Sequence, residues 1–332
     1  MPDKSSAWIS RLARFRRANN RLASYELLVT VVPFVGLWIC MQALLHVSVW
    51  FSLLLAVPTA CLLLRVFIIQ HDCGHGSMFS SNRVNNNIGR CLGILTLTPY
   101  DYWRRSHAGH HASSGNLDRR GIGDIDTLTV TEYGNLGLLG KLRYRMYRHP
   151  IVMFVLGPTY LFVFRHRLPV GEMNKGLKPW MSVIGTNLSI LVVFSAVIYF
   201  VGLKNFLIVH IPVVMICASI GVWLFYIQHQ YEDAHWEKEP EWSREHAALH
   251  GSSYYDLPSP IMWLTGYIGI HHVHHLSSRI PFYHLAKVLR EFPELKEIQR
   301  LTFLQSLGAV RLTLWDENSK QLISFKDALQ PA

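Results

Sequence analysis

The chain is short of cysteine and of acidic residues, and each shortage narrows what the protein is. Its five cysteines lie in or beside apolar segments without paired spacing, which is typical of reduced thiols and excludes a disulfide framework. The 22 acidic residues are outnumbered by 32 basic ones, so the formal net charge is +10. Internal repeats, low-complexity tracts and a Gly-rich phosphate loop are also missing. These absences exclude small disulfide-rich, solenoid and P-loop proteins.

The basic surplus lacks the features that indicate nucleic-acid binding, because no aromatic-laced basic domain accompanies it. We therefore expect no nucleic-acid partner. The N-terminal region has no apolar stretch ending in a small-residue cleavage site, so a removed signal peptide is not expected. Its Arg-rich, acid-poor composition is compatible with a transit peptide. Trp8, Leu12 and Phe15 at helical spacing favour an amphipathic helix at least as well, so we assign residues 1–24 as a cytosolic, interfacial N-terminus.

Long hydrophobic runs are present, and they explain how a chain with this charge can be 50% hydrophobic. The apolar residues cluster in blocks of about 20, roughly the length needed to cross ~30 Å of hydrocarbon. The blocks predict four transmembrane helices, Tyr25–Leu45, Val49–Ile69, Trp180–Val201 and Phe206–Ile227. Short turns join them in pairs. The predicted fold is an all-α integral membrane protein of one domain, residues 1–332, with four transmembrane helices in two hairpins.

The charge distribution predicts the orientation of the hairpins, 25–69 and 180–227, because cytoplasmic flanks hold an excess of Lys and Arg. Segment 70–179 carries 14 basic residues and segment 228–332 carries 10, whereas the two short outer turns share only Lys204. We therefore place both large segments on the cytoplasmic side as a helical cap, at the inner membrane if the protein is bacterial. Arg65, near the inner end of the second span, is expected to snorkel toward that side.

Two further apolar stretches, Ile88–Pro99 and Ile151–Phe164, are too short to span comfortably. We expect re-entrant or interfacial helices there, which hold segment 70–179 against the membrane. Asp118–Tyr133 is polar and punctuated by Gly, which predicts a loop, and the basic run Lys141–Arg148 predicts a helix at headgroup level. Helical patterning continues from Leu285 toward the C-terminus.

Three histidine clusters are the most informative positive feature of the sequence. If each cluster is helical, residues three and four apart share a face. The histidines at such spacing are His71, His75, His107, His110, His111, His271, His274 and His275. An even number of predicted crossings separates each cluster from the next, so all three lie on one side of the membrane. Eight imidazoles there can hold more than one metal ion.

A structural role without metal explains isolated histidines but not these clusters. We assign the isolated ones as surface or satisfied polar residues: His46, His149, His166, His210, His246, His250 and His284. Eight clustered imidazoles would repel one another if protonated, and would need as many partners if buried and neutral. Bound metal ions would hold the rings in their neutral form and would also be the partners of their nitrogens. An all-histidine set does not point firmly to structural zinc, and two iron ions sharing about eight nitrogens suit oxygen chemistry.

The chain resembles the membrane-bound fatty acid desaturases over nearly its whole length. The resemblance lies in the order and spacing of the three histidine clusters, called boxes in that family, and in the placement of the spans between them. That family has a His-x3-4-His box and two His-x2-3-His-His boxes around paired hairpins. The phrases His71-Asp72-Cys73-Gly74-His75-Gly76-Ser77 and Trp103-Arg104-Arg105-Ser106-His107 resemble the branch that acts on acyl lipids at positions such as delta-12. The resemblance implies two irons ligated mostly by histidine, with an additional ligand after the fourth span. His229 is the favoured candidate for that ligand, and His235 is its rival.

Two assignments refine this proposed diiron site. His-x-x-His-His is satisfied by His271, His274 and His275, so His272 is expected to point about 100° away on a helix and take no part. Carboxylates commonly orient metal-bound imidazoles through the second ring nitrogen. Of the candidates Asp72, Asp118, Asp124 and Asp126, only Asp72 is favoured for this role over loop chemistry or helix capping.

The resemblance also implies a reaction and its partners. Using O2 and two electrons, such an enzyme introduces a cis double bond into a lipid-linked acyl chain. An apolar tunnel between the spans is expected to align the chain, with Tyr100, Tyr102 and Trp103 at its mouth. Because the sequence has no His-Pro-Gly-Gly stretch of a fused cytochrome b5 domain, a separate ferredoxin or cytochrome b5 is expected to supply the electrons.

Two other classes of function are compatible with a histidine-rich membrane protein. A related diiron hydroxylase or ketolase acting on a carotenoid, sphingolipid, sterol or alkane would use the same boxes. A metal transporter needs polar ligands at mid-span, where the predicted helices offer essentially only His210 and Arg65 near their ends. A haem-binding subunit needs facing histidines inside the bilayer, whereas the clusters lie outside the spans. The sequence therefore disfavours both non-enzymatic functions.

Overall fold

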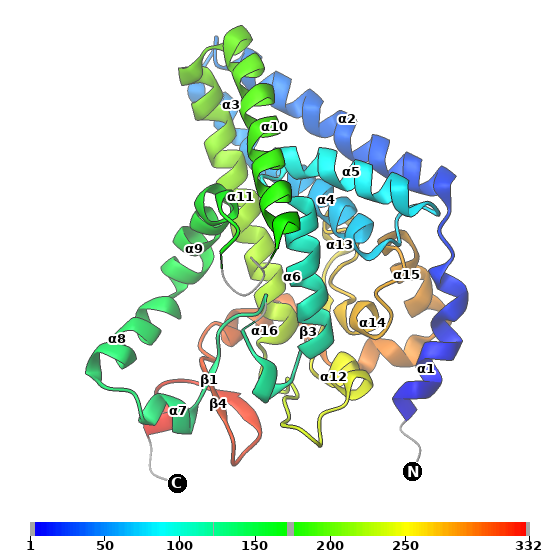
Figure 1. Cartoon of the computed structure of the whole chain (residues 1–332), viewed down its shortest axis with the longest axis vertical. Coiled ribbons are helices and arrows are strands. Elements are labelled where there is room, and N and C mark those ends of the chain that lie inside the picture. Colours follow the sequence, from blue (N-terminus) through cyan, green and yellow to red (C-terminus); the bar gives the residue numbers. More distant parts are fainter. Residues whose placement is uncertain (1–3, 122, 171–175, 330–332) are drawn as a thin grey trace.

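The computed structural model describes residues 4–121, 123–170 and 176–329, and these form a mostly helical protein (Figure 1). Four helical stretches are long and apolar enough to cross a membrane. They are α2 (Asn20–Leu44), α3 with α4 (Val49–Leu54 and Ala56–His75), α10 (Leu177–Val201) and α11 (Leu203–His229). The four predicted spans are confirmed, and the turns that pair them lie at one end of the molecule, at the top of Figure 1.

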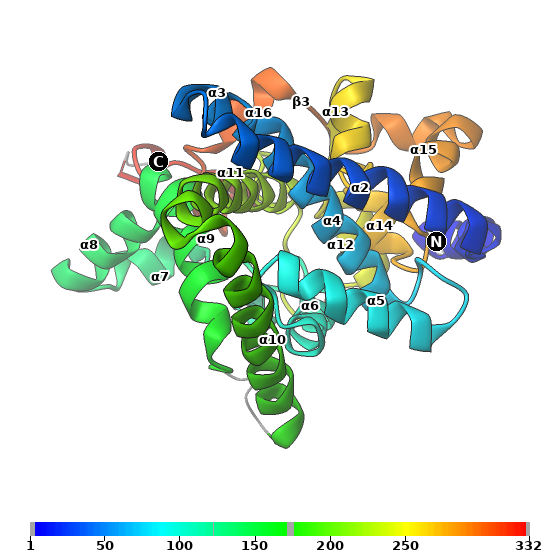
Figure 2. The ribbon, with the colours of Figure 1, turned by 90° about the horizontal axis from the view of Figure 1, so that it is seen from above.

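Two of these helices extend beyond the predicted apolar segments. Helix α4 continues to His75 and α11 to His229, so both carry histidines at their inner ends. They also pack against each other, and α4 packs in addition against α2 and α5 (Asn82–Leu95) (Figure 2). The first box and His229 are therefore fixed on neighbouring helices that share a buried interface.

Arg65 corrects one expectation, because its side chain is fully buried and does not snorkel. Its Nη2 forms an ion pair with Glu26 Oε2 at 2.5 Å, and its Nε donates to Thr30 Oγ1 at 3.1 Å. Nη1 donates to the carbonyl of Trp263, and the guanidinium carbon lies 4.0 Å from the centroid of that indole ring. A carboxylate one helix away is the partner that makes burial of the charge tolerable. Arg65 thus joins α2, α4 and the cap.

Replacing Arg65 by methionine is expected to destabilise the protein by about 3–5 kcal/mol, because Glu26 would keep a buried charge without its partner. The double variant Glu26→Gln/Arg65→Met should recover part of that loss. Thermal unfolding of the purified variants in detergent measures both. A double variant no more stable than Arg65→Met alone would contradict this role for the ion pair.

The segment between the hairpins is also helical. It contains α5, α6 (Tyr100–Ser113), α7 (Val130–Gly134) and α8 (Leu138–Tyr147). The expected short helix at 151–164 is present as two π-helical turns around a short α-helical one, η3 (Val152–Leu156), α9 (Gly157–Thr159) and η4 (Tyr160–Phe164). Helix α11 packs against η3 and α9. Residues 171–175 of this segment lie outside the described residues.

The C-terminal part of the cap adds short helices and strands around the third histidine cluster. The helical elements are α12 (Arg244–His250), α13 (Ser259–Leu264), α14 (His271–Leu276), α15 (Phe282–Glu291), η7 (Pro293–Glu297) and α16 (Phe303–Ala309). The strands here are β2 (Tyr254–Asp256), β3 (Arg300–Thr302), β4 (Leu314–Asp316) and β5 (Gln321–Ile323), and β4 pairs with β1 (Leu128–Thr129) from the segment between the hairpins. They form one sheet of order β1-β4-β5 and one β2-β3 pair, so the expected helical tail is only partly helical.

The N-terminal helix also departs from expectation. Helix α1 (Lys4–Leu12) and the 3-10 turn η1 (Ala13–Arg16) bury Leu12 and Phe15 inside the protein. The rings of Trp8 and Phe15 pack edge-on against Phe292, with centroids 5.4 and 6.1 Å apart. The apolar face that predicted an interfacial helix is therefore covered by the cap. Single-sequence periodicity does not distinguish these two ways of burying such a face.

Candidate metal centre

Five histidines from three helices form the first imidazole group: His71, His75, His107, His111 and His274. Their Nε2 atoms converge, with separations of 3.0 Å between His75 and His107 and 3.1 Å between His107 and His111. His274 Nε2 lies 3.2 Å from His111 Nε2. Helices α4, α6 and α14 therefore bring together the three boxes, and the group can hold a metal ion.

Four histidines form the second imidazole group: His110, His229, His271 and His275. His229 Nε2 lies 3.2 Å from His110 Nε2 and 3.0 Å from His271 Nε2. All four side chains are buried. This group can hold a second metal ion, so each of the nine predicted ligands lies in one of the two groups.

Helix geometry explains how the second and third boxes serve both groups. Residues four apart on a helix differ by about 40° in direction, whereas the residue at i+3 lies about 60° to the other side. His107 and His111 accordingly enter the first group, while His110 enters the second. On α14 the pattern is reversed, because His271 and His275 enter the second group and His274 the first. Each of these two boxes thus gives an i, i+4 pair to one group and its middle histidine to the other.

The spacing of the nitrogens fits metal ligation. Two imidazole nitrogens bound at roughly 2.1 Å lie about 3.0 Å apart at a right angle and about 3.4 Å apart at a tetrahedral angle. The Nε2 separations of 3.0–3.3 Å match these values. In addition, His275 Nε2 is buried and has no hydrogen-bond partner among the described residues. A bound cation would satisfy that nitrogen.

Burial also keeps the cap imidazoles in the form that binds metal. Desolvation, reinforced by neighbouring imidazoles, lowers the pKa of His107, His111, His271, His274 and His275 well below the usual histidine value. At neutral pH these rings are therefore uncharged, and an uncharged ring has a nitrogen lone pair free to coordinate.

The second ring nitrogens show which groups orient the histidines. His71 Nδ1 lies 3.0 Å from Asp72 Oδ1, and Asp72 Oδ2 accepts a 2.6 Å hydrogen bond from the Phe282 amide. His110 Nδ1 contacts Asp124 Oδ1, and His229 Nδ1 lies 3.2 Å from the carbonyl oxygen of Gly251. Asp72 thus has the geometry expected of an orienting carboxylate. Asp124, which the sequence did not favour over the other loop aspartates, has the same geometry.

The other two aspartates lie elsewhere. Asp118 Oδ2 accepts a hydrogen bond from the Glu239 amide, and the amide of Asp126 donates to Tyr147 Oη. Neither interaction reaches a box histidine. Local sequence patterns do not single out Asp124, because its contact with His110 depends on how residues 123–127 pack over α6.

Replacing Asp124 by asparagine is expected to weaken metal binding by about 10- to 100-fold, because a neutral amide orients His110 less strongly than a carboxylate. Asp126→Asn, two residues away in the same loop, is the matched control and should keep near-normal affinity. Competition of each purified variant with a chelator of known affinity measures the difference. Equal affinity in both variants would contradict the role of Asp124.

His235 and His272 belong to neither imidazole group. His272 is fully buried, and its Nε2 lies 2.9 Å from the carbonyl oxygen of Leu295. Burial lowers its pKa to about 4, so the neutral ring donates to that carbonyl. The ring of His235 lies 4.6 Å from that of His246, beyond the end of α11.

A large apolar cavity of about 750 Å³ extends from His71 and His107 of the first imidazole group and His271 of the second, between α4, α11 and the η3–η4 segment. Tyr102 and Trp103 are among the residues that line it, and Trp103 stacks on His107 with ring centroids 4.7 Å apart. Tyr100 is not part of its lining and corrects that expectation. The Tyr100 hydroxyl donates to the Cys73 carbonyl at 2.8 Å, and its ring occupies the space that a Cβ at Gly89 would need. Its role is to fix α6 against α4 and α5.

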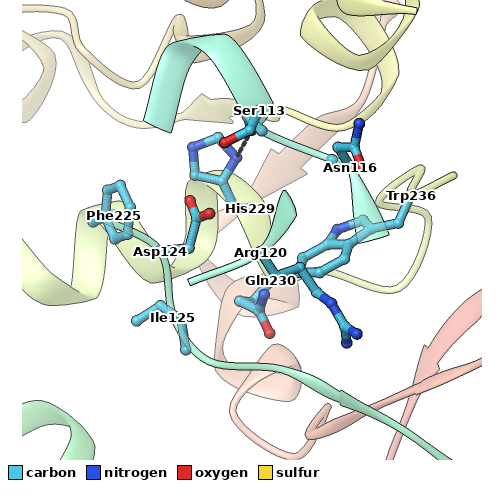
Figure 3. A pocket seen from close by; sticks show the side chains of 11 residues that line it. Ser113, Asn116, Arg120, Asp124, Ile125, Phe225, His229, Gln230 and Trp236 are labelled. Carbon is cyan, nitrogen blue, oxygen red and sulfur yellow. Dashed lines mark hydrogen bonds between the residues drawn. The ribbon is translucent and has the colours of Figure 1, made fainter. Parts of the chain in front are cut away.

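A much smaller cavity, of about 10 Å³, lies behind the second group. Figure 3 shows Asp124, His229 and Gln230 among the residues around it, with Phe225 on one side. This volume suffices for about one water molecule among several polar side chains. On the side of His229, the second group is therefore bordered by a tightly packed polar shell.

Comparison with known proteins identifies the family of the chain. Residues 48–305 match the family model described as fatty acid desaturase. The chain is 42% identical to a fatty acid desaturase of Bacillus subtilis (strain 168), over 97% of this chain and 91% of the relative. It is 24% identical to the sn-1 oleoyl-lipid 12-desaturase of Anabaena variabilis, over 82% of this chain and 76% of that protein. It is 29% identical to the sn-1 acyl-lipid omega-3 desaturase (ferredoxin) of Synechocystis sp., over 67% of this chain and 62% of that protein. The chain therefore belongs to the fatty acid desaturase family and is an oxidoreductase.

Proposed function

We propose that this enzyme introduces a cis double bond into the acyl chain of a membrane lipid, using O2 and two electrons at two iron ions. The observation that carries the proposal is that two all-imidazole groups, one buried and one with His75 and His107 half-buried, border the same apolar cavity. The reaction balances when two hydrogens leave adjacent methylenes, a donor adds two electrons, and two protons enter. O2 is then reduced to two waters.

The nine histidines of the two groups are the proposed ligands, and Asp72 and Asp124 are proposed to orient His71 and His110. Bound there, iron would supply O2 activation and the oxidising power for hydrogen removal. An all-nitrogen donor set without thiolates is compatible with iron, and its burial keeps bulk water from the reacting carbons. The ligands for each ion come from three helices, and the two groups together use four, α4, α6, α11 and α14, so the site depends on the whole fold.

The cavity is proposed to align the acyl chain. Its volume of about 750 Å³ falls within the roughly 300–1,000 Å³ typical of sites for small molecules. Phe67, Leu224 and Phe225 are among the apolar side chains that line it, and Trp103 lies where it meets His107. Holding a flexible chain in one conformation beside the imidazoles fixes which carbon pair is closest. Substrates linked to lipids, as named for the cyanobacterial relatives, suit an apolar cavity between membrane-spanning helices.

We propose that the cap lies on the cytoplasmic side, and the charge distribution supports this orientation. The outer turns share only Lys204, whereas the segments that carry the boxes are rich in basic residues. A separate electron donor is proposed to reach the site from this side. Ferredoxin, named for the Synechocystis relative, and cytochrome b5 are the candidates.

Expression in a host with simple membrane lipids, together with a ferredoxin and its reductase, tests the proposed function. Fatty acid profiling should reveal a new monoenoic or dienoic acid that is absent when His107 is replaced by alanine. A hydroxylated or keto product would instead indicate the related hydroxylase or ketolase reaction. An unchanged profile with an iron-loaded, ferredoxin-reducible protein would contradict the proposal.

A further inference from the structure

Two basic pockets in the cap each reach a different imidazole group. The first, of about 220 Å³, lies between α1, α12 and α14. Arg16, Arg244 and Arg279 line it together with one acidic residue, Glu245, and it reaches His275 of the second group. It is therefore a solvent-accessible approach to that group from outside the membrane-spanning helices.

The second pocket, of about 580 Å³, lies on the other side of Arg16 and Arg279, which line both pockets. Arg17 adds a third guanidinium here, and the pocket reaches His75 of the first group. The same arginines thus separate two pockets, and each pocket reaches a proposed ligand of a different metal ion.

The charge of this surface, Arg16, Arg17, Arg244 and Arg279, is available to a partner. Among the described residues, Arg17, Arg244 and Arg279 form no ion pair. We call these four residues the basic face. Unpaired guanidiniums around a concave surface create a positive potential that attracts acidic proteins.

The basic face is also held in place. Arg16 Nε donates to Ser277 Oγ at 2.8 Å, which connects the N-terminal segment to the end of the third box. Arg11 pairs with Glu294 at 3.1 Å and Arg14 pairs with Glu291, so α1 and η1 are fixed to the C-terminal helices. A preorganised surface loses little entropy when a partner docks.

We propose that the basic face is the docking site of an acidic electron-donor protein, and that electrons enter the metal centre through His75 and His275. The proposal rests on the proposed function. A one-electron donor such as a [2Fe–2S] ferredoxin is oxidised by one electron at each docking event, so each double bond requires two events. Both pockets bring the donor close to an imidazole, and a short path favours fast transfer.

The position of the basic face favours a protein over a membrane surface. Helices α1 and α12 lie at the end of the molecule opposite the turns that join α2 to α3 and α10 to α11 (Figure 1). The spans run from those turns toward the middle of the molecule, and α1 and α12 lie beyond their inner ends, so the pocket at α1 and α12 lies outside the membrane-spanning part. The test must still distinguish docking of an acidic protein from binding to anionic lipid.

The charge-reversal variant Arg244→Glu/Arg279→Glu tests the proposal, because neither side chain is a proposed ligand or lines the acyl cavity. The control is Arg143→Glu/Arg311→Glu, which changes the net charge equally at two exposed arginines outside both pockets. Purified iron-loaded protein in detergent is mixed with reduced plant-type ferredoxin. Binding is measured by surface plasmon resonance, and anaerobic ferredoxin oxidation by stopped-flow absorbance.

Binding and the second-order oxidation rate should both fall by about tenfold or more at low salt in the charge-reversal variant, and by little in the control. The charge-keeping variant Arg244→Lys/Arg279→Lys should retain most of both, which separates docking from misfolding. The proposal is overturned if ferredoxin binding and oxidation are the same in the charge-reversal and control variants. It is also overturned if the charge-reversal variant loses binding to phosphatidylglycerol vesicles but still oxidises ferredoxin at the wild-type rate. Reduction by dithionite should be unchanged in all variants, and its absence in every one would indicate failure of the diiron proposal instead.

Discussion

Replacement of His271 by alanine is expected to abolish desaturation, whereas replacement of the adjacent His272 should leave substantial activity. His271 Nε2 lies 3.0 Å from His229 Nε2 in the second imidazole group, so its loss removes one of four proposed ligands. His272 instead donates to the Leu295 carbonyl. Alanine there leaves a buried carbonyl without its donor, which costs about 1–3 kcal/mol of stability but no ligand.

Fatty acid profiles, bound iron and thermal unfolding of the two variants measure these effects. We expect His271→Ala to lose activity and about one iron, and His272→Ala to unfold at a lower temperature while retaining about two. Equal loss of activity in both variants would contradict the division of the third box. Asparagine at 272 is a useful control, because its side-chain amide can still donate toward Leu295.

The second large effect is expected at His229, the additional ligand beyond the three boxes. Replacement by alanine should abolish activity, because its Nε2 lies within 3.2 Å of both His110 Nε2 and His271 Nε2. His235→Ala is the matched control six residues later. Its ring packs near His246 outside both groups, so near-normal activity and iron content are expected.

Iron content and electron paramagnetic resonance of the nitric oxide complex of the reduced protein separate loss of the metal from loss of the fold. We expect His229→Ala to retain iron in the first group only, with an altered spectrum, and His235→Ala to match the wild type. Loss of iron in His235→Ala together with a wild-type spectrum in His229→Ala would transfer the ligand role to His235.

The sequence alone was sufficient to predict the four spans and the histidines of the two imidazole groups, because both predictions depend on local periodicity. Runs of about 20 apolar residues predict membrane crossings whatever their neighbours are, and the i, i+3 and i+4 spacings place imidazoles on one helix face. His229 and His235 could be ranked by their distance from the end of the fourth span. The partition into two groups was not predicted, because it depends on how α6 and α14 are rotated relative to each other.

The features that the sequence missed depend on contacts between distant segments. Arg65 is buried because Glu26 on another helix neutralises it, and the apolar face of α1 is covered by Phe292. Asp124 reaches His110 only because a loop folds back. Hydropathy and residue spacing do not predict such contacts between distant segments.

The most direct test of the central claim is the metal content of the purified wild-type protein, measured by mass spectrometry alongside its visible absorption spectrum. Two imidazole groups predict about two irons per chain and no haem absorption. Replacement of His111 in the first group or His275 in the second should each remove about one iron. Zinc or haem as the native metal, or a single iron that neither substitution displaces, would contradict a diiron centre.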